Sequence, residues 1–313
     1  MFAKHGRTRY NAMKKLSPLL IITAASLWGT MGLFTRKLTE LGYNPLQLML
    51  ARASMTAFCL IVYFFIFDRE KLKIKLKDLW LFLLTSLVSV ILFNFCYMSA
   101  INTGSTGIAS TLLYTSPIFV TVISAFLFRE KITKLKITAL ALAFAGCVLV
   151  SGIIGSGSTI SSKALLFGIA SGFTYGMYSI FTKIALKKYS PLTFTAYTFL
   201  VSTVLLIPIS GKSLVTTTIS QEGADMLLIL LFALATNVIP YICFTTGLKY
   251  MDAGKANITA TVEPVVATLL GIFVFDERLT FISGLGVFLV IFSAVILNIP
   301  HKAPKQTYQN IKK

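Results

Sequence analysis

Apolar residues fall along this chain in ten long runs that are separated by short polar linkers. A hydrocarbon core about 30 Å thick needs roughly 20 consecutive, mostly apolar residues per helical span. The runs have this length, so the pattern predicts an all-α, polytopic membrane protein with ten transmembrane helices. The seventh span is expected to end before a loop rich in Ser and Thr over 210–225. The expected spans are 17–35, 45–67, 79–101, 106–128, 134–153, 163–186, 191–209, 225–248, 254–275 and 280–298.

The same pattern of residues occurs twice in the chain. A shift of 147 positions places Ser99–Thr133 on Thr246–Thr280 without a gap. The same shift places Trp28 on Tyr175, far upstream of that segment. A constant register over two separated blocks is the signature of an internal repeat. The sequence therefore predicts a duplication.

Each copy is expected to hold five spans, one over residues 1–153 and the other over 163–300. Because five is odd, equivalent spans cross the membrane in opposite directions, and the repeats are inverted. Inverted repeats recur in secondary transporters, whose halves rock about a site near the middle of the membrane. Residues 301–313 are expected to form a basic cytoplasmic tail.

The placement of charge predicts the orientation. The chain is 56% hydrophobic and only 13% charged, whereas soluble domains are about one quarter charged. Its formal net charge of +18 comes mostly from Lys and Arg in the tails and in alternate linkers. This asymmetry follows the positive-inside rule and places both termini in the cytoplasm. Topology thus explains the basic charge, and nucleic acid is not an expected partner.

Short motifs spread over the whole chain form a combined pattern: Ser26–Gly29, Arg52, Pro117, Phe128–Glu130, Glu263-Pro264 and the stretch 275–280. This pattern resembles the EamA-type members of the drug/metabolite transporter superfamily. The resemblance implies ten helices in two five-helix repeats and movement of a small organic solute, often export of amino acids or related metabolites. It does not identify the solute. The sequence departs from the pattern in the second copy, where Tyr175 stands at the Trp position, so the two sides of a central site are not equivalent.

Aromatic and amide side chains recur at similar depths in several predicted spans. Asn94 and Tyr241 are equivalent under the repeat, so the same depth is polar in both halves. Such a lining favours neutral, zwitterionic or mildly cationic solutes over phosphate esters, because Arg52 is the one plausible cation near the midplane. The expected substrate-binding residues are Trp28, Asn94, Tyr114, Tyr175, Tyr178, Asn237, Tyr241 and Glu263.

Glu263 is the one acidic residue well inside a predicted span, and Pro264 follows it directly. Carboxylates inside a membrane are costly and by default indicate function. In one interpretation Glu263 is the coupling residue, which alternately binds a proton or a cationic group of the solute. In the other it is a structural tie, paired with Arg52 or with backbone groups freed by Pro264. The sequence leaves both open.

Arg52 lies about a third of the way into the second span, where a charge should face protein or water and have a partner. The first interpretation is a structural charge, held in a salt bridge between helices or anchored otherwise. Its head group can also reach the outer interface, because the span begins near Pro45. Direct contact with the solute is the remaining alternative.

Other classes of protein fit the sequence less well. Catalysis inside the membrane needs a nucleophile with a base, or metal ligands, yet both histidines lie in the tails, so an enzyme, a metal site and a cofactor are not expected. A scaffold is a further alternative, but no appended domain is visible. A proton-independent facilitator of the same fold is an alternative to a proton-coupled transporter. The expected partners are a small-molecule solute and the lipid bilayer of the cell membrane, and a homodimer is left open.

Overall fold

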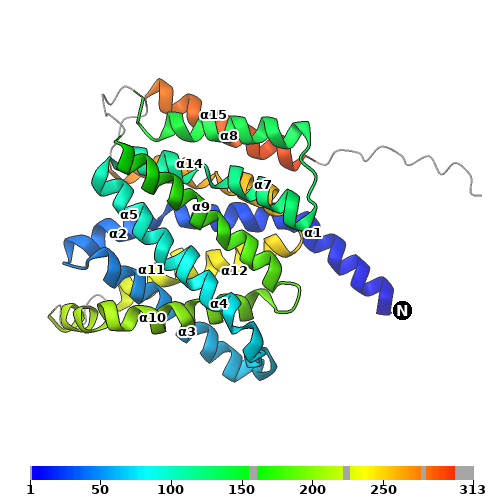
Figure 1. The fold of residues 1–313 in the computed structure, drawn as a ribbon, viewed down its shortest axis with the longest axis vertical. Coiled ribbons are helices and arrows are strands. Elements are labelled where there is room, and N and C mark those ends of the chain that lie inside the picture. The colour runs from blue at the N-terminus through cyan, green and yellow to red at the C-terminus, as the bar shows by residue number, and fades with distance from the viewer. Residues whose placement is uncertain (1, 155–160, 221–225, 276–279, 300–313) are drawn as a thin grey trace, which may run out of the picture.

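The computed structural model describes residues 2–154, 161–220, 226–275 and 280–299, and within these ranges every regular element is a helix (Figure 1). The motif at 276–279 and the tail 301–313 lie outside the described residues. The first half contains α1 (Phe2–Gly29), α2 (Met31–Glu40), α3 (Pro45–Phe67), η1 (Arg69–Leu72), η2 (Leu76–Asp78), α4 (Leu79–Ser86), η3 (Leu87–Leu92), α5 (Phe93–Thr103), α6 (Thr106–Leu113), α7 (Ser116–Phe128) and α8 (Lys134–Val150). The second half contains α9 (Ser162–Ala185), α10 (Pro191–Ser220), α11 (Met226–Ala233), η4 (Leu234–Val238), α12 (Ile239–Lys249), α13 (Ala253–Ala260), α14 (Glu263–Phe275) and α15 (Phe281–Asn298).

Nine helical segments of the described chain are long and apolar enough to cross a membrane, which makes this a multi-pass membrane protein. They correspond to nine of the ten predicted spans. The other predicted span is α8, which has 17 residues. At 1.5 Å per residue that is about 26 Å, slightly less than the hydrocarbon core of a typical bilayer.

The duplication predicted from the sequence is visible in the bounds of the helices. A shift of 147 positions carries α6 onto α13 and α7 onto α14, residue for residue at both ends. The same shift carries the first residue of the π-helical segment η3 onto the first residue of η4. Helix breaks and π segments are therefore inherited features of one ancestral unit.

Three breaks interrupt helices inside predicted spans, between α1 and α2, α6 and α7, and α13 and α14. At each break a threonine hydroxyl donates to the backbone carbonyl three residues earlier, and the same carbonyl also accepts the threonine's own N–H, so both polar groups of the threonine are satisfied where the helix stops. The three hydroxyl bonds are Thr30 to Leu27 at 2.7 Å, Thr115 to Leu112 at 2.6 Å and Thr261 to Ile258 at 2.7 Å.

The loop predicted to start at residue 210 is wrong, because α10 continues as a helix to Ser220. Hydroxyl groups on its last turns have partners on α3. The Gln47 amide nitrogen donates to Ser213 Oγ at 2.6 Å and to Thr217 Oγ1 at 2.9 Å. The Ser and Thr content that looked like a loop therefore serves contact between helices.

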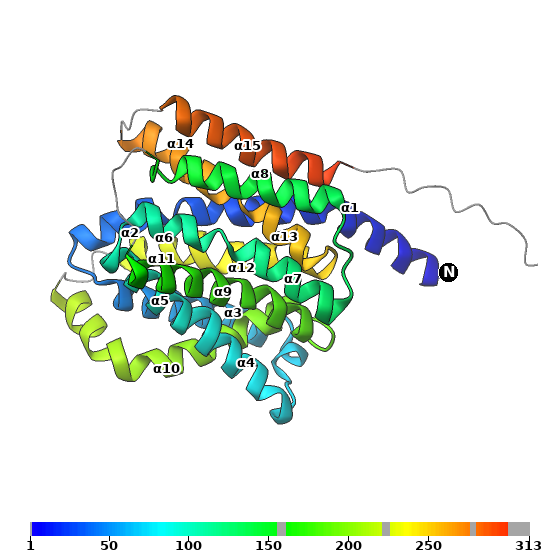
Figure 2. The ribbon, with the colours of Figure 1, turned by 45° about the horizontal axis from the view of Figure 1, so that its top comes forward.

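Equivalent helices of the two repeats pack against each other. α8 lies along α15, and α3 lies along α10. Figures 1 and 2 show the α8–α15 pair on one side of the molecule and α3 and α10 on the other. The helices α1, α9, α12 and α13 lie between these pairs, so the middle of the molecule is built from both repeats.

Glycines allow the closest of these approaches. On α9, Gly172 faces Thr115, and a Cβ atom added at Gly172 would lie 2.5 Å from its Oγ1. Between α8 and α15, a Cβ atom at Gly146 would lie 2.8 Å from the carbonyl oxygen of Gly286. Contacts this short cannot be made by any residue with a side chain unless a helix moves.

We expect Gly146→Ala to lower the free energy of unfolding by about 1–3 kcal/mol, because the added methyl group meets backbone of α15. Thermal unfolding of the purified protein in detergent measures this. Gly32→Ala is the matched control, because Gly32 lies in helix α2 with no atom within 4 Å of an added Cβ. The control should be neutral or slightly stabilising. Equal losses in both variants would contradict tight packing of α8 on α15.

Candidate functional site

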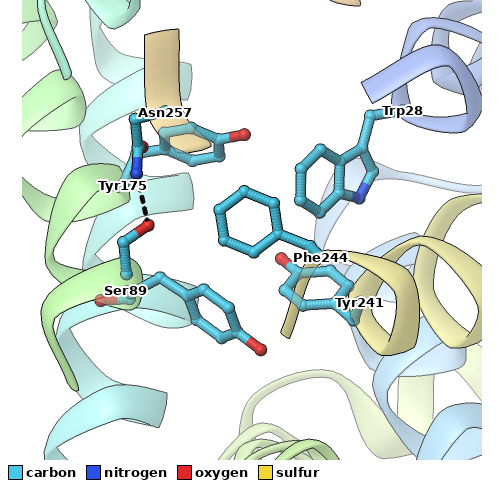
Figure 3. Close-up of a pocket in the computed structure, with 8 residues that line it drawn as sticks. Trp28, Ser89, Tyr175, Tyr241, Phe244 and Asn257 are labelled. Carbon is cyan, nitrogen blue, oxygen red and sulfur yellow. Dashed lines mark hydrogen bonds between the residues drawn. The ribbon is translucent and has the colours of Figure 1, made fainter. Parts of the chain in front are cut away.

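A narrow cavity with about 10 Å³ of free space lies in the middle of the molecule, where α1, η3, α9, α12 and α13 meet (Figure 3). Both repeats contribute to its wall. Among the residues that the structure describes, no charged side chain lines it. The lining residues are Trp28, Ser89, Tyr175, Tyr178, Ser179, Tyr241, Phe244 and Asn257, and we call this space the aromatic cavity.

Aromatic rings contact one another around this cavity. The ring centroids of Trp28 lie 5.3 Å from those of Tyr241 and of Phe244. Tyr178 and Tyr241 meet edge to face at 5.0 Å. In Figure 3 the Phe244 ring lies between Trp28 and the polar residues. Rings packed in this way offer both flat faces and polar edges to a solute with an aromatic or ammonium group.

Polar atoms occupy the other side of the aromatic cavity. Asn257 Nδ2 donates to Ser179 Oγ at 2.7 Å, the bond drawn in Figure 3, and also to the carbonyl of Ala253 at 3.0 Å. Ser89 Oγ is buried and has no hydrogen-bond partner in the described part of the chain. A buried hydroxyl without a partner is available to a water molecule or to a polar group of a solute.

Ser89 lies in the π-helical segment η3. Its counterpart under the repeat, Thr236, lies in η4, where its hydroxyl donates to the carbonyl of Phe232 at 2.7 Å. Short π segments inside α-helices are rare and occur frequently at functional sites. The two segments therefore mark the same level in each repeat, and only the first leaves a free hydroxyl there.

Four of the eight residues predicted to bind substrate line the aromatic cavity, namely Trp28, Tyr175, Tyr178 and Tyr241. The other four do not line it. Asn94 on α5 donates to the carbonyl of Val90 in the preceding segment η3 at 2.7 Å, and Asn237 is buried within η4. Tyr114 packs in an apolar cluster of buried residues that includes Cys147 and Val265, and Glu263 begins α14.

Four residues that line the aromatic cavity are not among those predicted from the sequence: Ser89, Ser179, Phe244 and Asn257. Asn257 has a visible signal, since it belongs to the run of alternating polar residues that leads to Glu263. Phe244 has none, because a phenylalanine in an apolar span is the commonest kind of lipid-facing or core residue. Ser89 is equally inconspicuous until its place in a π segment is known.

Glu263 is the first residue of α14, directly after the break at Thr261. Its backbone contacts α1, because a Cβ atom added at Gly29 would lie 2.8 Å from the carbonyl oxygen of Glu263. Gly29 thus allows the break to approach Trp28. No hydrogen bond or ion pair engages the Glu263 carboxylate in the described part of the chain. Three tyrosines lie close enough to interact electrostatically with this carboxylate, namely Tyr97, Tyr114 and Tyr175.

The salt bridge considered between Arg52 and Glu263 is wrong. Arg52 lies on α3 with its guanidinium over the ring of Phe232, 5.2 Å from the centroid, and with Nη1 3.4 Å from Met31 Sδ. It forms no ion pair among the described residues, and its Nε is buried without a hydrogen-bond partner. The cation–π contact supports the structural interpretation, because it ties α3 to α11.

Glu130 joins the two repeats at the end of α7. Its side chain accepts hydrogen bonds from the backbone N–H groups of Ala253 at 2.7 Å and Gly254 at 3.2 Å, which are the first residues of α13. Lys136 Nζ lies 3.6 Å from Glu130 and 3.6 Å from Asp252. The carboxylate thus satisfies free N–H groups where a helix begins, and it sits beside a buried ammonium.

Most of the chain also matches a known family. The model of the EamA-like transporter family matches residues 15–152 and 162–299, once per repeat. The chain therefore belongs to the EamA-like transporter family, a family of membrane transporters.

Individual relatives match over most of their length. An uncharacterized transporter of Archaeoglobus fulgidus is 28% identical over 85% of this chain and 90% of its own. The uncharacterized inner membrane transporter YicL of Salmonella typhimurium is 22% identical over 90% and 94%. One solved crystal structure superimposes with a TM-score of 0.73 at 17% identity, and it covers 90% of this chain and 95% of its own. That likeness shows a shared fold.

We expect Glu130→Ala to lower the free energy of unfolding by about 1–3 kcal/mol, because two N–H groups lose their acceptor and Lys136 loses a nearby carboxylate. Glu130→Gln should cost less, since an oxygen acceptor remains. Thermal unfolding in detergent measures both. Glu70→Ala is the control, because the side chain of Glu70 is 79% exposed and its pair with Lys73 is at the surface. A loss no larger than that of the control would contradict the capping role.

Proposed function

We propose that this protein is a secondary transporter that moves small neutral, zwitterionic or mildly cationic organic solutes across the cell membrane by alternating access. Amino acids and related metabolites are the expected class, and export is the expected direction. Ten spans with both termini in the cytoplasm are part of the proposal, with α8 as the short tenth span. What carries it is the aromatic cavity, which is walled by both repeats and has no charged lining residue in the described ranges of the chain.

The position of the cavity fits a site that is exposed to each side in turn. Trp28 and Ser89 come from the first repeat, and the other lining residues come from the second. Rocking of one repeat against the other would open the gap between these two sets from one side or the other. The breaks near Thr115 and Thr261 supply irregular backbone within the bundle, which transporters use where helices bend.

The volume of the aromatic cavity supports a closed or partly closed state. Sites for small ligands commonly enclose about 300–1,000 Å³, whereas the free space in this cavity is only about 10 Å³, which is room for about one water molecule. Phe244 fills its centre (Figure 3). A solute the size of an aromatic amino acid would therefore need movement of the rings or of the repeats before it could bind.

Glu263 is the proposed coupling residue. Its carboxylate lacks a hydrogen-bond partner or counter-ion in the described chain, it follows a helix break, and its backbone packs against the helix that carries Trp28. A carboxyl group in this setting can take up and release a proton as access alternates. Because Arg52 forms no ion pair with Glu263, a salt bridge between these two residues does not explain why Glu263 lies in the membrane.

We expect purified protein in liposomes to show saturable flux of an amino acid or a related zwitterion, and the flux should respond to an imposed pH gradient. The panel contains labelled amino acids, quaternary amines and phosphorylated sugars, and empty liposomes are the control. Saturable flux of phosphorylated sugars alone would contradict the solute class. Flux that ignores the gradient would support the facilitator in place of the coupled transporter.

In the same liposomes, we expect Glu263→Gln to reduce the response to the pH gradient at least roughly tenfold, because a neutral amide cannot exchange a proton. Binding of the solute without a gradient should persist. Glu40→Gln is the matched control, since the side chain of Glu40 is 56% exposed at the end of α2. An unchanged gradient response in the Glu263 variant would remove the coupling role.

A further inference from the structure

A second cavity, of about 360 Å³ and open to solvent, lies on the side of the molecule that the charge pattern assigns to the cytoplasm. Four lysines line it, together with one carboxylate. The charged lining residues are Lys14, Lys183, Lys249, Lys255 and Asp252, and we call this space the lysine cavity.

The carboxylate in the lining of the lysine cavity does not neutralise the four lysines. Asp252 already lies 3.6 Å from the buried ammonium of Lys136, which is not part of the lining. Lys183 Nζ donates to the backbone carbonyl of Met251, a neutral acceptor. None of the four lining lysines forms a salt bridge within the described ranges of the chain. A concave surface with several cations and few anions concentrates anions from solution.

The two cavities share the same four helices. The aromatic cavity uses α1, α9, α12 and α13, and the lysine cavity uses the same helices closer to the cytoplasmic end. On α9, Ser179 and Lys183 are one helical turn apart, and on α13, Asn257 and Lys255 are two residues apart. Along α9 the linings of the two cavities are therefore about one helical turn apart.

The positive-inside rule does not by itself account for these lysines. That rule concerns residues on loops, such as Lys73, whose side chain is 74% exposed. Lys183 and Lys255 instead lie within α9 and α13 and are only partly exposed. Partly buried ammonium groups lose hydration, so they are expected where they have something to bind.

We propose that the lysine cavity is the vestibule of the transport pathway, and that it binds the carboxylate of the solute before the solute passes to the aromatic cavity. This inference rests on the proposed function and narrows its solute class. A zwitterion with a carboxylate satisfies both spaces, because its anionic group is held by lysines and its apolar body by rings. Quaternary amines without an acidic group can bind favourably only in the aromatic cavity.

The local potential of the lysine cavity can be measured by chemical labelling, without any flux. All four native cysteines, Cys59, Cys96, Cys147 and Cys243, are replaced in the full chain, and Tyr250→Cys then supplies one thiol in the lining. Anionic, cationic and neutral methanethiosulfonates of similar size are compared. We expect the anionic reagent to react at least roughly tenfold faster than the cationic one, after correction by the neutral reagent.

Leu76→Cys is the matched surface control, because Leu76 is 84% exposed between Lys75 and Lys77 but does not line the lysine cavity. Its preference for the anionic reagent should be only about twofold and should vanish at high salt. In the Tyr250→Cys protein, adding Lys183→Gln and Lys255→Gln should remove most of the preference. Equal preferences at the two reporters, or no effect of the lysine substitutions, would overturn the proposal.

The chemical class of the ligand in the lysine cavity is tested with the same thiol in phosphatidylcholine nanodiscs, by measuring whether an added compound slows its labelling. Benzoate should slow labelling at least roughly twofold, whereas benzamide, its neutral analogue, should not, because only a carboxylate pairs with the lysines. Protection by phosphatidylglycerol, with no further effect of benzoate, would assign the cavity to a lipid headgroup and overturn the solute role. Labelling of the thiol does not require transport. If the liposomes showed no flux but the anionic reagent still reacted faster, the result would contradict the proposed transport function and leave the charge of the lysine cavity established.

Discussion

Within a membrane, each backbone N–H and C=O group must find a partner inside the protein, and this constraint underlies the whole structure. It forces the chain into helices and makes every interruption costly. Here the interruptions near Thr115 and Thr261 lie within the bundle, and at each the threonine hydroxyl and its own N–H both donate to the carbonyl three residues earlier. Irregular backbone is thereby kept away from lipid and close to the centre, where a transporter needs movable parts.

Because the chain is a duplication, these helix breaks and the π segments occur once in each repeat. The breaks and the π segments recur at a shift of 147 positions, yet the copies have diverged where they meet. Trp28 faces Tyr175 with ring centroids 6.5 Å apart, although the two positions are equivalent. Ser89 has a free hydroxyl, whereas Thr236 bonds to its own helix. The fold is thus nearly symmetric while the site is not, so opening to the two sides need not expose the same chemistry.

Arg52, Glu130 and Glu263 stand in three different physical settings. Arg52 is held by an aromatic ring and a thioether, and Glu130 caps the start of a helix from the other repeat. Glu263 has neither kind of partner among the described residues. The contrast separates charges that stabilise the fold from one that is free to act, because a group that already has a strong partner gains little by changing its state.

The sequence by itself determined the membrane class, the duplication and four aromatic residues of the cavity, because span length, register and polar residues in apolar runs are local properties. It missed Phe244 and Ser89, and it misread Ser213 and Thr217 as loop residues. Only the tertiary structure decided these points, and it also separated Arg52 from Glu263. The physical reason is that helix rotation and packing decide which side chains face one another, and residues distant in sequence fix both.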